Sequence, residues 1–176
     1  MAEPWLRGDL GELDPLRRGV VHALWLASED VEVWCRGLSD VELESRPLGL
    51  PSVGFQMRHV VRSLDRLLTY AEGRQLDERQ MVALQGEMVA GVDLFSEFAA
   101  GMKVAEGRVR GFSPSSYAEF RGVGRRLLPS TVGGLLVHCA EHTQRHAGQM
   151  VTTVKVVVGL RGASSSMDGE DGGIRC

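Results

Sequence analysis

Apolar residues recur at intervals of three and four along four long stretches of the chain, a pattern that predicts amphipathic helices. The first predicted helix runs from about Asp14 to Gly37, because Asp14 followed by Pro15 is a favourable helix start. The other three run from near Ser52 to near Gly73, from about Asp77 to Lys103, and from Ser130 or Thr131 to about Val158. The pattern predicts an all-α four-helix bundle but does not fix the order of its helices up and down.

Two segments between these helices carry turn signals. Ser39, with Glu42 three residues later, resembles a capping box, so a short helical turn is expected there. Residues 104–129 lack a sustained period and contain several glycines and two prolines. They predict a long connection before the last helix, with a short helical piece around Tyr117 to Arg121 and no strand. Connections of this length in a compact domain are often functional.

The chain has 176 residues, a length typical of one domain. We expect an N-terminal arm at 1–13, the bundle at 14–160 and a flexible tail at 161–176. The tail is expected because the residues past Gly159 are polar and rich in glycine, with little to bury.

Composition excludes several classes of function. The net charge is −3 and the basic residues are dispersed, so the chain carries no electrostatic footprint for nucleic acid. No apolar run approaches the ~20 residues needed to cross a bilayer, and the N-terminus has no signal-peptide pattern, so a cytoplasmic location is expected. The three cysteines form no CxxC motif, and Cys35 and Cys139 are expected as small apolar residues on helices.

Three histidines, His138, His142 and His146, follow one another at spacings of four on the last predicted helix. Residues four apart lie on one face of a helix, so two imidazoles can point at one ion. A helical wheel places His142 and His146 on the apolar face, with His138 about 40° to the other side of His142. Thr143 follows His142, so the HExxH pattern of zinc proteases is absent.

The spacing alone does not establish a metal site, because histidine pairs four apart also occur as ordinary hydrogen-bonded core residues. A metal would need a third ligand, for which His22 and His59 are the candidates outside this helix. His59 lies about 130° from the middle of its helix's apolar stripe, beside Gln56 and Ser63. Either this polar stripe is solvated, or it lines a wet pocket inside the bundle.

Two segments, SVGFQMRHV at 52–60 and LLVHCAEHTQRHAGQM at 135–150, together resemble the DinB-like superfamily, which includes the YfiT-type proteins. The resemblance covers roughly residues 14–158 and implies a four-helix bundle. It also implies that His59, His142 and His146 bind one divalent metal ion, and that His138 is not a ligand. Ala147 stands where many relatives carry arginine, so an anion-holding role of that arginine is not carried over.

Three neutral imidazoles leave a metal ion with an open position, as in catalytic zinc sites. Zinc or nickel is expected, and iron, manganese or copper is also compatible with such ligands. The resemblance implies an enzyme acting on a small-molecule substrate, either by transfer or conjugation of a low-molecular-weight thiol or by metal-assisted hydrolysis. Gln56, His138 and Gln149 are candidate pocket residues, and no separate catalytic residue is identified.

Other interpretations stay open. A non-catalytic metal-binding bundle, acting as a dimeric stress or sensor module, would close the site with a fourth ligand such as His138 or Cys139. A histidine-bearing bundle without metal is the third option. Arg58, Arg62 and Arg66 lie along one side of the second helix, either as a solvated face or as a grip for an anionic substrate. A homodimer is compatible with the several apolar sides of the first and last helices.

Overall fold

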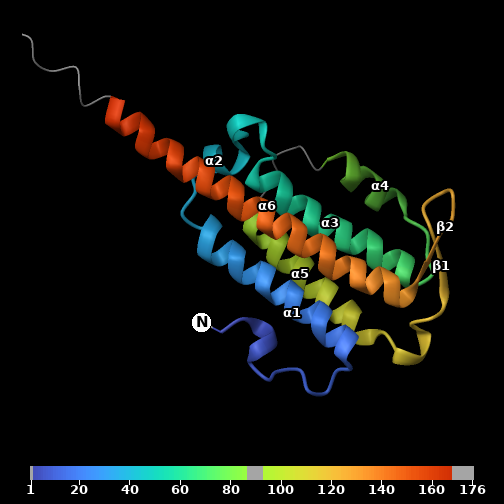
Figure 1. The fold of residues 1–176 in the computed structure, drawn as a ribbon. Helices are drawn as coiled ribbons and strands as arrows, with labels where there is room; N and C mark the ends of the chain where they lie inside the picture. The colour runs from blue at the N-terminus through green and yellow to red at the C-terminus, as the bar shows by residue number, and fades with distance from the viewer. Residues whose placement is uncertain (1, 87–92, 168–176) are drawn as a thin grey trace, which may run out of the picture.

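The structure, a computed structural model, describes residues 2–86 and 93–167, with the backbone alone at residue 84 and residues 162–167. Four long helices in these ranges form a bundle (Figure 1): α1 (Pro15–Asp30), α3 (Val53–Ala71), α5 (Leu94–Gly111) and α6 (Val132–Met167). The all-α four-helix bundle predicted from the sequence is confirmed, with a small two-stranded sheet added to it.

Side-chain hydrogen bonds cap the first turns of helices α1 and α3. The Asp14 carboxylate accepts from the backbone N–H groups of Leu16 and Arg17, and Ser52 Oγ accepts from the N–H of Phe55 at 3.1 Å. A side-chain cap of this kind satisfies N–H groups that have no partner within the helix. Both predicted starts are therefore confirmed. So is the predicted capping box of Ser39 and Glu42, which begins the short helix α2 (Asp40–Glu44).

Contacts between the helices fix their directions. Gln144 of α6 donates to the carbonyl of Ala23 in α1, and Lys155 lies over the ring of Trp34 just beyond α1, so α1 and α6 run in parallel. Thr153, in the second half of α6, donates to the carbonyl of Pro51, just before α3, whereas His142 in the first half contacts His59 farther along α3, so α3 and α6 are antiparallel.

Helix α5 runs parallel to α3, because Arg62 contacts Glu97 while Asp65, one turn later in α3, contacts Arg108. The order along the chain is thus up, down, down, up. The connection from α3 back to the start of α5 passes outside the bundle through α4 (Glu78–Gln85), as Figure 1 shows.

A single large apolar core lies between the four helices. Its fully buried members include Leu24 of α1, Leu64 and Leu68 of α3, and Leu136 of α6. Cys35 and Cys139 are buried in the same core, as predicted, and burial raises the pKa of each thiol to about 12. These thiols are therefore protonated at neutral pH and contribute to packing.

The prediction of one continuous helix from Asp77 to Lys103 is wrong. Asp77 and Asp93 each cap a separate helix, since each side chain accepts a backbone N–H three residues later. Part of the predicted stripe, at residues 87–92, lies outside the described residues. Gly101 allows close packing of α5 on α3, because a Cβ there would lie 2.6 Å from Cβ of Val61.

The predicted long connection at 104–129 is also partly wrong. Helix α5 continues to Gly111, and β1 (Phe120–Val123) pairs with β2 (Leu128–Thr131) as an antiparallel hairpin. The helical piece expected around Tyr117 to Arg121 is absent, and the neighbouring 3-10 turn η4 spans Pro114–Ser116. The two strands are four residues long and contain glycine or proline, so apolar and polar residues do not alternate along them. The hairpin is therefore recognised only from the backbone pairing of the two strands.

The remaining elements are short, apart from the last helix. The N-terminal segment contains one 3-10 turn, η1 (Pro4–Leu6), and a second, η3 (Pro47–Gly49), precedes α3. Helix α1 continues into a π-helical turn, η2 (Val31–Cys35). Helix α6 runs to Met167, past the predicted end at Val158, and residues 168–176 of the predicted tail lie outside the described residues. No helix in the described part of the chain is long and apolar enough to cross a bilayer.

Candidate metal centre

Three imidazoles converge where α3 packs against α6. Nε2 of His59 lies 3.2 Å from Nε2 of His142, and the rings of His59 and His142 each lie 4.5 Å, centroid to centroid, from the ring of His146. One nitrogen of each ring lies within 4.8 Å of the other two. Residues from two distant stretches of chain thus meet at one point.

The antiparallel packing of α3 and α6 explains this convergence. His142 and His146 are one turn apart on the face of α6 that turns toward α3, as their spacing predicts. Gln56 and Ser63, which flank His59 on the polar stripe of α3, are 1% and 4% exposed. The interpretation of this stripe as a solvated surface is therefore wrong, and it lines the inside of the bundle.

The protonation state of His142 suits metal binding. The pKa of His142 is lowered to about 4, because burial disfavours the charged ring and the imidazoles of His146 and His59 would repel it. His142 is therefore neutral at pH 7, which is the form that coordinates a metal. His146 Nδ1 lies 2.6 Å from Oε1 of Gln56, a contact that places the proton on Nδ1 and the lone pair that a metal needs on Nε2.

The distances fit a divalent ion. Two imidazole nitrogens bound at ~2.0–2.1 Å in tetrahedral geometry are about 3.3 Å apart, and the two Nε2 atoms of His59 and His142 are 3.2 Å apart. A direct N–H···N hydrogen bond has a similar length. The third imidazole and the neutral state of His142 favour the metal. The residues present therefore fit the group that the resemblance implies.

The other candidate pocket residues are placed differently. Gln56 is buried and orients His146, as described above. The His138 side chain is 45% exposed, with Nδ1 3.6 Å from Oε2 of Glu141, and it lies outside the convergent group. Gln149 is exposed on α6, and its backbone carbonyl accepts the hydroxyl of Thr153. Of the three, only Gln56 contacts a member of the cluster through a hydrogen bond that the structure shows.

No fourth protein ligand closes the centre among the described residues, where the only convergent set of His, Cys, Asp and Glu side chains is the three histidines. Cys139 is buried in the apolar core and does not belong to this set. A cavity of about 260 Å³ instead adjoins His142. Its lining consists of Ser63, Arg66, Leu67, Tyr70, Leu76, His138 and His142.

The arginines of α3 do not form the solvated face that the sequence allowed. Arg58 is 1% exposed and forms a bidentate ion pair with Glu44 at 2.7 and 2.8 Å. Arg62 donates to Glu97 and to the carbonyl of Ala83. Arg66 alone of the three lines the cavity beside His142, where its Nη2 donates to Ser63 Oγ at 2.9 Å.

Sequence reasoning missed three of the cavity residues, Leu67, Tyr70 and Leu76. Tyr70 continues the stripe of α3 that passes through His59, Ser63 and Arg66 at steps of three and four, so the periodicity carried its signal. Leu76 lies in the connection after α3 and had no such signal.

A helical bundle that gathers three histidines from two antiparallel helices beside an open cavity defines a class of candidate metal-centre proteins. The chain belongs to the DinB superfamily, whose family model matches residues 24–150. Comparisons with curated proteins and with solved structures gave no match.

Proposed function

We propose that this protein is a divalent-metal-dependent enzyme that transfers or conjugates a low-molecular-weight thiol to a small-molecule substrate. The observation that carries the proposal is the convergence of three imidazole nitrogens beside an accessible cavity, with no described fourth ligand. Structural zinc sites have four protein ligands, whereas catalytic sites have three and an open position. Zinc or nickel is the expected metal, with iron or manganese as alternatives.

His59, His142 and His146 would hold the ion, and Gln56 fixes the proton of His146 on Nδ1. When bound, the ion supplies Lewis acidity, which lowers the pKa of a thiol or water at its open position. Arg66 places a positive charge in the wall beside His142 and favours an anionic group there. Leu67, Tyr70 and Leu76 give the cavity an apolar wall, and its volume of about 260 Å³ restricts the substrate to a small molecule.

The cavity lining favours thiol chemistry over hydrolysis. No Asp or Glu belongs to the described lining, so no carboxylate is placed to take a proton from water. A thiol needs no such base once its pKa is lowered, because the thiolate is itself the nucleophile. Hydrolysis is the second candidate, because His138 lines the cavity without belonging to the cluster and could serve as a base. A cytoplasmic location and a homodimer stay predictions.

The test combines metal content with turnover. Elemental analysis of the purified protein is expected to show about one divalent ion per chain, absent in His142→Ala and present in His138→Ala. Electrophile consumption is then assayed with several low-molecular-weight thiols, with and without chelator. A chelator-sensitive rate that His138→Ala retains supports thiol transfer, whereas ester or amide hydrolysis lost in His138→Ala indicates the hydrolase. A bound ion without any chelator-sensitive rate would favour the non-catalytic module.

A further inference from the structure

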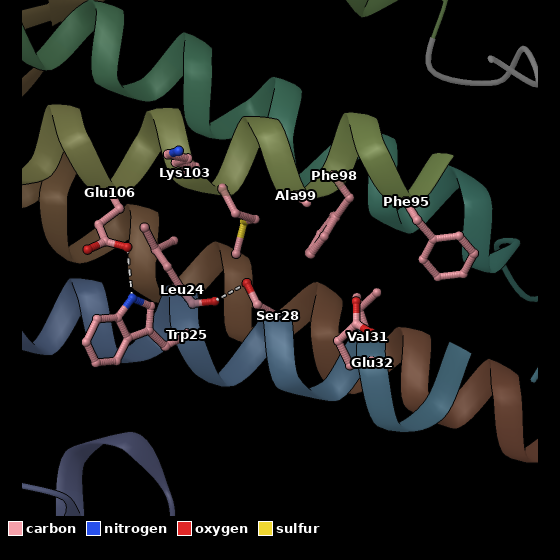
Figure 2. A pocket seen from close by; sticks show the side chains of 11 residues that line it. Leu24, Trp25, Ser28, Val31, Glu32, Phe95, Phe98, Ala99, Lys103 and Glu106 are labelled. Atoms are coloured by element: carbon pink, nitrogen blue, oxygen red, sulfur yellow. Dashed lines mark hydrogen bonds between the residues drawn. The ribbon is translucent and has the colours of Figure 1, made fainter. Parts of the chain in front are cut away.

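A second cavity lies on the opposite side of the bundle from the histidines, between α1 and α5 (Figure 2). Its volume is about 230 Å³. The buried side chains of Leu24, Phe98 and Met102 form its floor, and the half-buried rings of Trp25 and Phe95 form its walls. Figure 2 shows the Phe98 ring pointing from α5 toward α1. The cavity is therefore aromatic and apolar, and no residue of the metal centre lines it.

The backbone widens at one end of this cavity. Helix α1 gives way to the π-helical turn η2 at Val31, and both Val31 and Glu32 line the cavity. Turns of this kind are rare, and they occur frequently at functional sites. The cavity is thus bordered by a departure from regular helix rather than by two uninterrupted helices.

Its polar groups are already paired within the protein. Trp25 Nε1 donates to Oε2 of Glu106 at 2.8 Å, and Ser28 Oγ donates to the carbonyl of Leu24 at 2.9 Å, both drawn in Figure 2. Glu32 accepts two hydrogen bonds from Arg36, each of 2.8 Å. An apolar ligand could therefore enter without leaving these groups unpaired, which would otherwise cost free energy.

Charge at the mouth of the cavity gives the ligand a preferred sign. The carboxylate of Glu32 pairs with Arg36, and that of Glu106 pairs with Arg110, which also pairs with Glu12. Lys103 also lines the cavity and forms no ion pair with any residue that the structure describes. Lys103 is thus the charged lining residue that an anionic group on a ligand could pair with.

We propose that this cavity binds small aromatic carboxylates. The ring lies between Trp25, Phe95, Phe98 and Met102, and the carboxylate lies at Lys103. The site is independent of the metal centre and does not rest on the proposed catalytic function. Its ligand class follows from an aromatic lining with, at its edge, one lysine that has no ion-pair partner among the described residues.

The experiment titrates the full chain at low salt with 4-phenylbutyrate, 4-phenylbutanol and 4-phenylbutylamine. Binding is followed through the NMR signal of the Met102 methyl group. The acid is expected to shift that signal, and the alcohol should bind about fivefold more weakly because it lacks the ion pair with Lys103. The amine should bind more weakly still. His142→Ala is expected to bind the acid as the parent does, which separates this site from any carboxylate binding at a metal.

Three variants complete the test. Ala99→Leu, on the α5 wall, fills the cavity at a helical position that tolerates leucine, and it should abolish the shift. Lys103→Glu should weaken binding of the acid about fivefold without changing the affinity for the alcohol. Arg79→Glu, which reverses an exposed charge on α4, should change neither of these two affinities. Equal affinities of acid and alcohol, parental binding by Ala99→Leu, or an unmoved Met102 signal would each overturn the proposal.

Discussion

The two cavities differ in whether the buried polar groups around them have hydrogen-bond partners. On the α3–α6 side, Nδ1 of His142 and Nε2 of Gln56 are buried without a hydrogen-bond partner among the described residues, next to three imidazoles. On the α1–α5 side, the indole of Trp25 and the hydroxyl of Ser28 are paired inside the protein. Buried polar groups without partners cost free energy. Buried polar groups of the first site thus lack partners, whereas those of the second site are paired, and an anionic ligand could be held there by Lys103 at the edge.

The difference teaches that the polarity of a helix face does not show whether the face is inside or outside. The apolar face of α1 packs into the core, as its periodicity predicts. The polar stripe of α3 is also inside, where it contributes His59 to the candidate metal centre. The following predictions test this division, from the largest expected effect to the smallest.

Phe98→Ala should be the most damaging change to stability and the least damaging to metal binding. Phe98 is 4% exposed in the core, and its removal would enlarge the α1–α5 cavity. We expect a loss of about 3 kcal/mol in the free energy of unfolding, measured with urea. Zinc stoichiometry, measured in the same preparation, should not change. A variant that folds but loses its zinc would show that the two sides of the bundle are coupled.

Zinc should stabilise the protein through the α3–α6 side alone. At a free zinc concentration 100 times the dissociation constant, the gain in unfolding free energy is about 2.7 kcal/mol. His142→Ala should lose this gain, and the matched variant His138→Ala, on the same helix but outside the cluster, should keep it. Thermal unfolding with and without zinc measures both. Equal stabilisation of the two variants would contradict the assigned ligand set.

Gln56→Leu should weaken zinc binding by about 10- to 100-fold, because the acceptor that fixes the His146 ring is lost. Gln56→Glu keeps an acceptor in that place and should retain parental affinity or exceed it. Competition with a chromophoric chelator gives both dissociation constants. If leucine and glutamate lower the affinity equally, Gln56 contributes packing and does not orient the ring.

The metal-free protein should lose stability as the pH falls from about 6.5 toward 4. Burial, followed by repulsion from His146 and His59, lowers the pKa of His142 from 6.5 to about 4 in the folded chain. The unfolded chain therefore binds more protons than the folded chain in this range. The contribution of His142 to the free energy of unfolding is thus fully present above pH 6.5 and is lost as the pH falls toward 4. We expect a loss of about 1–2 kcal/mol, discounted for partial exposure.

Urea unfolding at several pH values measures this dependence, with His142→Gln as the control. Burial also lowers the pKa of His22, so the variant should keep part of the slope. A variant slope equal to that of the parent would show that His142 does not carry the effect.

Local signals in the sequence were sufficient for much of the fold. Asp14 and Ser52 begin helices because a capping hydrogen bond reaches only two or three residues along the chain. The shared face of His142 and His146 follows from the helical repeat itself. The third predicted helix failed for the opposite reason: its apolar period continued across a real break, and the cap at Asp93 was not recognised in the sequence.

By itself, the sequence determined the amphipathic helices α1, α3 and α6, where they begin, and a pair of histidines on one face of α6. Tertiary structure alone decided the up, down, down, up order, the hairpin of β1 and β2, and the inward direction of His59. The physical reason is the distance along the chain over which each interaction acts. Caps and periodicity act over a few residues, whereas the side of α3 that is buried depends on how α6, far along the chain, packs against it.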